Sequence, residues 1–254
     1  MNFAGLLSGW RRGERAAVAG EPGIRSVART HVGRIRTINE DRVFDDAARG
    51  LWAVADGMGG HSAGDIAAQA LVDALRALAD DPAPFDDDAI AATLVDAGQR
   101  IHATAAGKTQ VSGSTIVALH VVVDEATLFW AGDSRAYRVR DRRIEQLSRD
   151  HSLVQDLVDS GMLARDQADR HPQAHVITRA LGATPGVVIE RRSIDVRPGD
   201  LYLLCSDGLT RGHADPALPD YRGGALDEIA DDLLGDALTA GGADNISLVL
   251  IAIG

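Results

Sequence analysis

The stretch Leu51-Trp-Ala-Val-Ala-Asp56-Gly57 is an apolar run of strand length that ends in an aspartate and a glycine. Two further apolar runs end in an aspartate beside a glycine or a small polar residue, and a fourth aspartate, followed by an asparagine, opens onto the apolar run at the C-terminus; these are Asp133, Asp207 and Asp244. Taken singly, each aspartate is explained by turn formation, because Asp and Gly favour the turn beside a strand. Taken together, the four predict that carboxylates gather at one edge of a sheet.

Carboxylates held close together repel each other and raise each other's pKa values unless a cation neutralises them. The candidate ligands are hard oxygens from Asp and Glu, together with the backbone carbonyl of Gly57, and the sequence has one cysteine and therefore no cysteine pair. Such a set favours Mg²⁺ or Mn²⁺, which keep several bound waters, over tetrahedral zinc. The number of carboxylates exceeds what one ion needs, so we expect an aspartate that bridges two ions roughly 3.5–4 Å apart. Two ions so placed lower the pKa of a shared water and favour in-line attack on phosphorus.

A second motif places a cation beside an acidic pair. Arg36 stands four residues before Glu40 and Asp41 in the sequence Arg-Thr-Ile-Asn-Glu-Asp. A guanidinium group suits two-point binding of a phosphoryl group better than an ammonium group does. The alternative is that Arg36 forms a surface ion pair with Glu40, because such pairs are common.

Composition limits the class of protein. The chain has 254 residues, 45% of them hydrophobic, and a net charge of −11. No basic stripe is present to neutralise phosphates, so we expect no nucleic-acid partner. No apolar stretch reaches the ~18 residues of a membrane span, so we expect no stable membrane insertion. The single cysteine, Cys205, lies in an apolar run and is expected to be a buried core residue of a cytoplasmic protein.

The order of expected elements indicates an α+β fold. Residues 1–22 are expected to form a flexible N-terminal arm, with a weak interfacial anchor as the alternative, and residues 23–254 to form one domain. Hairpins and a meander without regular βαβ alternation predict antiparallel sheets with helices on their outer faces. Expected strands are 24–37, a hairpin over 43–55, a meander over 113–147, and 187–196, 201–206 and 246–253. Expected helices are 63–78, 87–105 and 225–238, and residues 148–185 form a polar excursion with one short helix.

Six short motifs occur together in the order of a known family. They are Arg36-x-x-Asn-Glu-Asp41, Ala55-Asp-Gly-Met-Gly-Gly-His61-x-x-Gly-Asp65, Gly113-Ser-Thr115, Ala131-Gly-Asp-Ser-Arg-Ala-Tyr137, Ser206-Asp-Gly-Leu209 and Asp244-Asn-Ile246. On these residues, the chain resembles the metal-dependent Ser/Thr protein phosphatases of the protein phosphatase 2C type, in their compact bacterial form. The resemblance covers about residues 24–253. It implies a four-layer α-β-β-α sandwich of two antiparallel sheets, with metal ions held at its end.

The resemblance also implies a role for each motif residue. Asp56 is expected to bridge the two catalytic Mn²⁺ or Mg²⁺ ions, with the Gly57 carbonyl on one of them. Asp207 and Asp244 resemble the ligands of the other ion, and Arg36 resembles the phosphate clamp. Three further acidic residues have supporting roles: Glu40 binds through water, Asp41 lies behind it, and Asp133 binds a third, weaker ion shared with Asp207. Residues 148–185 correspond to the family's mobile flap.

The chain departs from the family pattern at two places. Met58 follows Asp-Gly, where animal-type members have a proposed general-acid histidine, and the later His61 is expected either to contact substrate or to be a turn or helix-cap residue. His175 stands in the flap where bacterial relatives often have Asn or Ser, which affects the third ion or the flap conformation. His102, His120 and His213 are expected to be surface or packed histidines.

Two functions from different classes remain open at this point. The first is metal-dependent hydrolysis of phosphoserine and phosphothreonine by a monomeric enzyme that acts on phosphoproteins and opposes a bacterial Ser/Thr kinase. The second is a catalytically silent module that keeps the fold in order to bind a kinase or scaffold. A decayed site would have lost at least one of Asp56, Asp207 and Asp244, and all three are present. The sequence therefore favours the enzyme.

Overall fold

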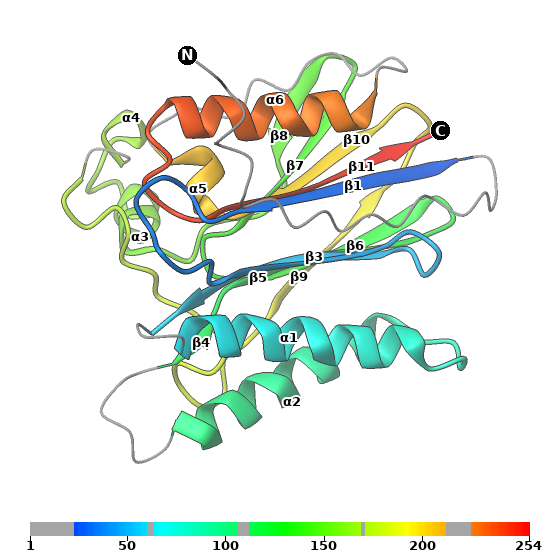
Figure 1. The fold of residues 1–254 in the computed structure, drawn as a ribbon, viewed down its shortest axis with the longest axis horizontal. Coiled ribbons are helices and arrows are strands. Elements are labelled where there is room, and N and C mark those ends of the chain that lie inside the picture. Colours follow the sequence, from blue (N-terminus) through cyan, green and yellow to red (C-terminus); the bar gives the residue numbers. More distant parts are fainter. Residues whose placement is uncertain (1–22, 60–62, 106–111, 169–170, 212–224) are drawn as a thin grey trace.

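Two antiparallel sheets lie face to face in the computed structural model, which describes residues 23–59, 63–105, 112–168, 171–211 and 225–254 (Figure 1). Sheet A has the strand order β1-β11-β10-β7-β8, formed by Ile24–His31, Ile246–Ile253, Leu201–Cys205, Arg135–Arg140 and Arg143–Gln146. Sheet B has the order β2-β3-β5-β6-β9, formed by Asp41–Asp46, Leu51–Met58, Ile116–Val122, Glu125–Ala131 and Glu190–Asp195. The short strand β4 (Gly113–Ser114) pairs with β3.

Helices cover the outer face of each sheet, which confirms the expected four-layer α+β sandwich (Figure 1). Helices α1 (Ala63–Asp80) and α2 (Asp87–Ala105) pack on sheet B, and α6 (Leu226–Thr239) packs on sheet A. The inner faces of the two sheets share a third apolar cluster that includes Trp52, Leu204 and Val249. Three short helices lie toward the left-hand end of the sandwich in Figure 1: α3 (Leu153–Asp159), α4 (Arg165–Ala168) and α5 (Asp207–Thr210).

The first strand is shorter than its alternating pattern predicts. We expected it to run to residue 37, but β1 ends at His31. Gly33 has a φ of +81°, and a Cβ atom there would lie 2.1 Å from the carbonyl oxygen of Asp244. The backbone N–H of Arg34 donates to the carbonyl of Gly242 at 2.7 Å. This turn ends the strand and brings residues 34–40 to the edge where β11 begins.

The expected meander over 113–147 is divided between the two sheets. Strands β5 and β6 belong to sheet B, whereas β7 and β8 belong to sheet A. The chain crosses at Gly132, whose φ is +115°, and a Cβ atom there would lie 2.5 Å from a methyl carbon of Thr115. Because only glycine fits this crossing, the next residue, Asp133, is placed between the sheets at their end.

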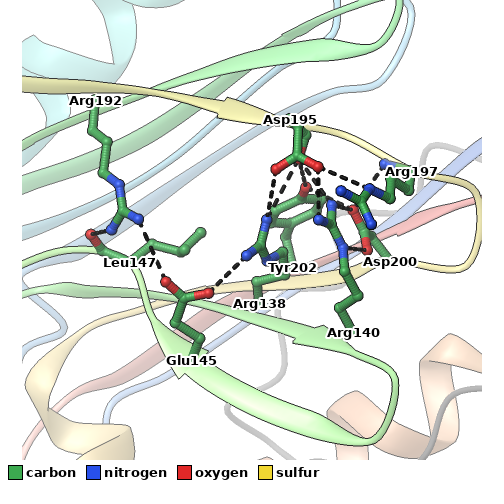
Figure 2. A network of polar contacts seen from close by, with 9 residues as sticks. All are labelled: Arg138, Arg140, Glu145, Leu147, Arg192, Asp195, Arg197, Asp200 and Tyr202. Carbon is green, nitrogen blue, oxygen red and sulfur yellow. Dashed lines mark hydrogen bonds and ion pairs between the residues drawn. The ribbon is translucent and has the colours of Figure 1, made fainter.

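A polar network joins the sheets at another edge (Figure 2). Asp195, at the end of β9 in sheet B, accepts a 2.8 Å hydrogen bond from Arg140 of β7 in sheet A. The same guanidinium donates at 2.6 Å to the buried carboxylate of Asp200, which also accepts from the Tyr202 hydroxyl. On the same β7 strand, Arg138 pairs with Glu145 at 2.7 Å. These contacts fasten β9 to sheet A at a distance from the pocket described below.

Several expectations concern single residues or the termini. Cys205 is buried and free, as expected. Across the described parts of the chain, no helix has both the length and the apolar character needed to cross a bilayer. The expected N-terminal arm (residues 1–22), His61 and His213 lie outside the described residues.

Candidate active site

A pocket of about 320 Å³ opens at the end of the sandwich where the predicted acidic residues meet. Its wall contains all but one of the described residues that the sequence singled out for the site. These are Arg36, Glu40, Asp56, Gly57, Asp133, Asp207 and Asp244, and the remaining lining residues are Met58, Gly59, Thr115, His175, Ile177, Arg211 and Asn245. Asp41 is absent from the lining because its side chain is buried. In the antiparallel register of β2 and β3 it stands opposite Asp56, which does line the pocket.

Asp56 is held by backbone and hydroxyl contacts rather than by an ion pair. Its carbonyl accepts hydrogen bonds from the backbone N–H of Thr115 at 2.8 Å and from the hydroxyl of Ser114 at 3.0 Å. Its own N–H donates to the Thr115 hydroxyl at 3.2 Å, and that hydroxyl is 2.7 Å from the hydroxyl of Ser134. The Gly-Ser-Thr and Gly-Asp-Ser motifs therefore fix the end of β3, leaving the Asp56 carboxylate free to face the pocket.

Two glycines allow Glu40 to approach β3. A Cβ atom on Gly57 would lie 2.1 Å from the carbonyl oxygen of Gly64, and one on Gly64 would lie 2.6 Å from Glu40 Oε1. The backbone N–H of Gly57 donates to the carbonyl of Glu40 at 3.2 Å. A side chain at either glycine would force these segments apart. Gly57 and Gly64, each next to an aspartate in the sequence, therefore allow β3, the start of α1 and Glu40 to pack closely at the site.

The site carries an excess of negative charge. Burial, reinforced by Asp207 and Asp244, raises the pKa of Asp41 to about 7, and burial together with Asp207 and Asp150 raises the pKa of Asp133 to about 8. Burial and the neighbouring carboxylates also raise the pKa of Asp56 well above its ordinary value. Like charges this close favour protonation or a bound cation.

Three carboxylate oxygens at the site are buried and lack a hydrogen-bond partner among the described residues. They are Oε1 of Glu40 and Oδ1 of Asp41 and of Asp207. Unpartnered buried acceptors are costly, and hard oxygens of this kind fit Mg²⁺ or Mn²⁺. Within the same described residues, no three Asp, Glu, His or Cys side chains form a ready-made metal cage. Ions that keep several waters, as Mg²⁺ does, need no such cage.

Two arginine side chains form ion pairs with carboxylates of the site. Arg36 donates to Asp244 Oδ2 at 2.9 Å, so its ion pair is with Asp244 and not with Glu40. Arg211 donates to the same oxygen at 2.7 Å and to Asp207 Oδ2 at 2.6 Å. The predicted clamp thus lies at the pocket with its side chain 49% exposed, and a second guanidinium lies deeper.

Sequence reasoning gave no role to Arg211 or Asn245. Asn245 accepts from the backbone N–H of Glu40 at 2.8 Å and donates to the carbonyls of Val32 and Ile38, each at 2.9 Å. It therefore holds the loop that carries Arg36 and Glu40. Its place directly after Asp244 in a motif was the available signal, whereas Arg211 had no local signal.

The histidine pair His171 and His175 has the spacing with which two helical histidines bind zinc. The structure forms turns over this segment rather than a helix. His171 Nδ1 accepts from the backbone N–H of Gln173 at 3.2 Å, and only His175 of the two lines the pocket. The pair does not form a helical zinc-binding face.

Known proteins share this chain's sequence and fold. The family model described as Protein phosphatase 2C matches residues 31–235. The serine/threonine protein phosphatase PstP of Mycobacterium tuberculosis (strain H37Rv) is 36% identical over 237 residues, covering 89% of this chain and 44% of that protein. This chain therefore spans less than half the length of PstP.

A second relative matches over nearly its full length, and a solved structure matches the fold. The serine/threonine phosphatase stp of Listeria monocytogenes serovar 1/2a is 33% identical over 238 residues, covering 88% of this chain and 93% of that protein. The catalytic domain of PstP, solved in complex with two manganese ions, has a TM-score of 0.80 and 33% identity, covering 91% of this chain and 98% of that one. The chain belongs to the protein phosphatase 2C family.

Proposed function

We propose that the chain is a metal-dependent protein phosphatase that hydrolyses phosphoserine and phosphothreonine in proteins, with Mn²⁺ or Mg²⁺ as cofactor. The observation that carries the proposal is the set of three buried carboxylate oxygens without a described partner, gathered beside a pocket that an arginine also lines. The match to the Protein phosphatase 2C model and the manganese-bound PstP domain support the same function.

The acidic residues divide into ion-binding groups by position. In this proposal Asp56, with the Gly57 carbonyl, would serve both catalytic ions from near the end of β3, and Asp207 and Asp244 would serve one of them from the start of α5 and from the turn before β11. Asp41 would act from the start of β2 and Glu40 from the residue before it, and Asp133 would provide a weaker third position near Asp207. When bound, two such ions lower the pKa of a water that attacks phosphorus in line.

Arg36 is the phosphate clamp in this proposal. Its guanidinium lies at the mouth of the pocket and reaches Asp244 with one nitrogen. The remaining N–H groups can bind phosphoryl oxygens without leaving that carboxylate, because a guanidinium carries five donors.

A cysteine nucleophile does not fit the structure. Burial raises the pKa of the Cys205 thiol to about 12, so it stays protonated at neutral pH. Its side chain is fully buried in the core and does not line the pocket. Cys205 is therefore no candidate for a phosphocysteine, and we propose that water attacks the phosphoryl group directly.

The substrates are phosphoproteins, and we propose that the chain acts as a monomer in the cytoplasm opposite a Ser/Thr kinase. The pocket volume of about 320 Å³ suits a phosphorylated side chain and not a folded protein, so a protein substrate must also rest on the surface around it. Residues 148–185 supply such a surface, because His175 and Ile177 from this segment line the pocket.

The test is hydrolysis of p-nitrophenyl phosphate by the full chain, with and without manganese. We expect turnover that requires Mn²⁺ or Mg²⁺ and that chelation by EDTA abolishes. Absence of turnover across a wide range of manganese concentration would favour the silent binding module.

A further inference from the structure

We propose that Arg211 is a built-in counter-ion that bridges Asp207 and Asp244 and competes with a metal ion for these two carboxylates. The inference rests on the proposed function, because it takes Asp207 and Asp244 as ligands of one ion. It adds a residue that sets how much metal the enzyme needs.

The geometry of Arg211 is that of a bridge. One terminal nitrogen lies 2.7 Å from Asp244 Oδ2 and the other lies 2.6 Å from Asp207 Oδ2. Asp207 begins α5 and Asp244 precedes β11, so the guanidinium joins two segments that are distant in sequence. One positive group therefore binds an oxygen of each of the two carboxylates.

Local structure keeps Arg211 in this place. The four-residue helix α5 ends at Thr210, and the backbone N–H of Arg211 donates to the carbonyl of Asp207 at 2.7 Å. This bond fixes the Cα of Arg211 one helical turn from Asp207, where a long side chain can fold back over the carboxylate. The side chain is 28% exposed, so it has a path to solvent.

The bridge is incomplete, which makes it displaceable. The Nε–H group of Arg211 is buried and has no hydrogen-bond partner within the described residues. Asp207 Oδ1 is likewise buried and lacks one there. A divalent ion offers these carboxylates twice the charge of the guanidinium, and a cation bound to both of them is repelled by Arg211. Metal binding by Asp207 and Asp244 is therefore in competition with the Arg211 bridge.

Arg36 provides the contrast within the same pocket. Among the described residues, its printed ion pair is with Asp244 alone, through one nitrogen, and its side chain is about half exposed. Arg36 therefore binds one of the two carboxylates, whereas Arg211 binds both. The two arginines have different roles despite their common partner.

The experiment measures manganese binding by titration calorimetry on the full chain after removal of metal with EDTA and dialysis. The variants are Arg211→Gln, which keeps the length and polarity but not the charge, Arg211→Ala, and Arg211→Lys, which keeps the charge. Arg76→Ala is the control, because Arg76 also pairs with a nearby aspartate, Asp73, but lies on α1 away from the pocket.

We expect Arg211→Gln and Arg211→Ala to bind Mn²⁺ about tenfold more tightly at the position that Asp207 and Asp244 share, equivalent to about 1.4 kcal/mol. Arg211→Lys is expected to fall between them and the unmodified chain, and Arg76→Ala to leave the affinity unchanged. In EDTA, loss of the counter-ion should lower the melting temperature by about 2–4 °C, and saturating Mn²⁺ should remove that difference.

Unchanged or weaker manganese binding by both uncharged variants would overturn the proposal. If either variant fails to fold without metal, it is prepared in Mn²⁺ and its affinity is read from competition with a chelator, and Arg211→Lys remains as a folded comparison. Tighter binding without hydrolysis of any phosphate ester would support the counter-ion and contradict the phosphatase function. Manganese-dependent hydrolysis with unaltered affinity would contradict the counter-ion alone.

Discussion

Ser206 donates a 2.7 Å hydrogen bond from its hydroxyl to Asp41 Oδ2, and this bond joins the two sheets directly behind the pocket. Asp41 opens β2 in sheet B, whereas Ser206 follows β10 in sheet A. The same hydroxyl accepts from the backbone N–H of Ser247 at 3.0 Å. One small side chain thus binds one oxygen of a buried carboxylate and one buried backbone N–H group, and it ties Asp41 of sheet B to sheet A.

Ser206→Ala is expected to lower the free energy of unfolding by about 1–3 kcal/mol, because it leaves a buried acceptor and a buried donor unpaired. It should also weaken manganese binding, since Asp41 is no longer fixed from sheet A. Urea unfolding and manganese titration measure the two effects. Ser193→Ala, on the exposed strand β9, is the control and should change neither.

Arg36→Ala is expected to raise KM for phosphate esters and to lower kcat. The guanidinium is proposed to bind the phosphoryl oxygens in both the ground state and the transition state, a contact worth roughly 2–4 kcal/mol. Steady-state kinetics on p-nitrophenyl phosphate at saturating Mn²⁺ give both constants, and Arg36→Lys tests whether charge alone suffices. Unchanged kinetics for Arg36→Ala would reduce its role to the ion pair with Asp244.

Arg165→Ala is expected to lower activity on phosphoproteins more than on p-nitrophenyl phosphate. Arg165 begins α4 within the 148–185 segment, is exposed, and donates a long hydrogen bond of 3.4 Å to Gln155. The small ester needs the ions and Arg36, whereas a protein draws on remote contacts for positioning. Arg191→Ala, an exposed arginine on β9, is the matched control. Equal losses on both substrates would show that the segment shapes the pocket, and no loss would make it passive.

The network of Figure 2 predicts a pH dependence of stability. Burial alone would raise the pKa of Asp200, but hydrogen bonds from Arg140, the Arg197 backbone and Tyr202 outweigh it and place the pKa below its ordinary value. A carboxyl group whose pKa is lower in the folded state than in the unfolded state stabilises the fold when it is ionised. This stabilisation is complete at a pH above the unfolded-state pKa of about 3.9, and it is lost as the pH falls through the folded-state pKa.

Asp200→Asn should therefore reduce stability at pH 7, by about 3 kcal/mol for a buried pair that loses one partner. The difference from the unmodified chain should shrink as the pH falls below about 4. Urea unfolding at pH 7, 5 and 3.5 checks this, with the exposed Asp88→Asn as control. A difference that is constant across these pH values would contradict the assignment.

Much of the site was predictable because its signals are local. Asp56 lies near the end of β3, and Asp133 and Asp207 lie two residues after β6 and β10, so each strand fixes the position of its aspartate. Helices α1, α2 and α6 were predicted because their apolar residues recur at helical spacing. The candidate ligands are all hard oxygen atoms, so the sequence alone favours Mg²⁺ or Mn²⁺ over zinc.

The errors arise where distant segments decide the outcome. Apolar and polar residues continue to alternate past His31, but the strand ends because Gly33 packs against the carbonyl of Asp244. These two residues are far apart in the sequence, so the local pattern does not reveal the contact. Gly132 looks locally like a hairpin turn, and its packing on Thr115 makes it a crossing between sheets. Arg211 could not be assigned because one of its two partners, Asp244, lies 33 positions away in sequence.

The most direct test of the central claim is release of inorganic phosphate from a phosphothreonine peptide, measured against manganese concentration for the full chain and for Asp207→Asn. Asp207 keeps one buried oxygen unpartnered among the described residues, and an amide in its place cannot supply the charge that holds the ions. We predict manganese-dependent release by the unmodified chain and none by Asp207→Asn, with circular dichroism showing that both are folded. Release at a near-normal rate by folded Asp207→Asn at saturating manganese, or release by the unmodified chain that persists in EDTA, would contradict the account.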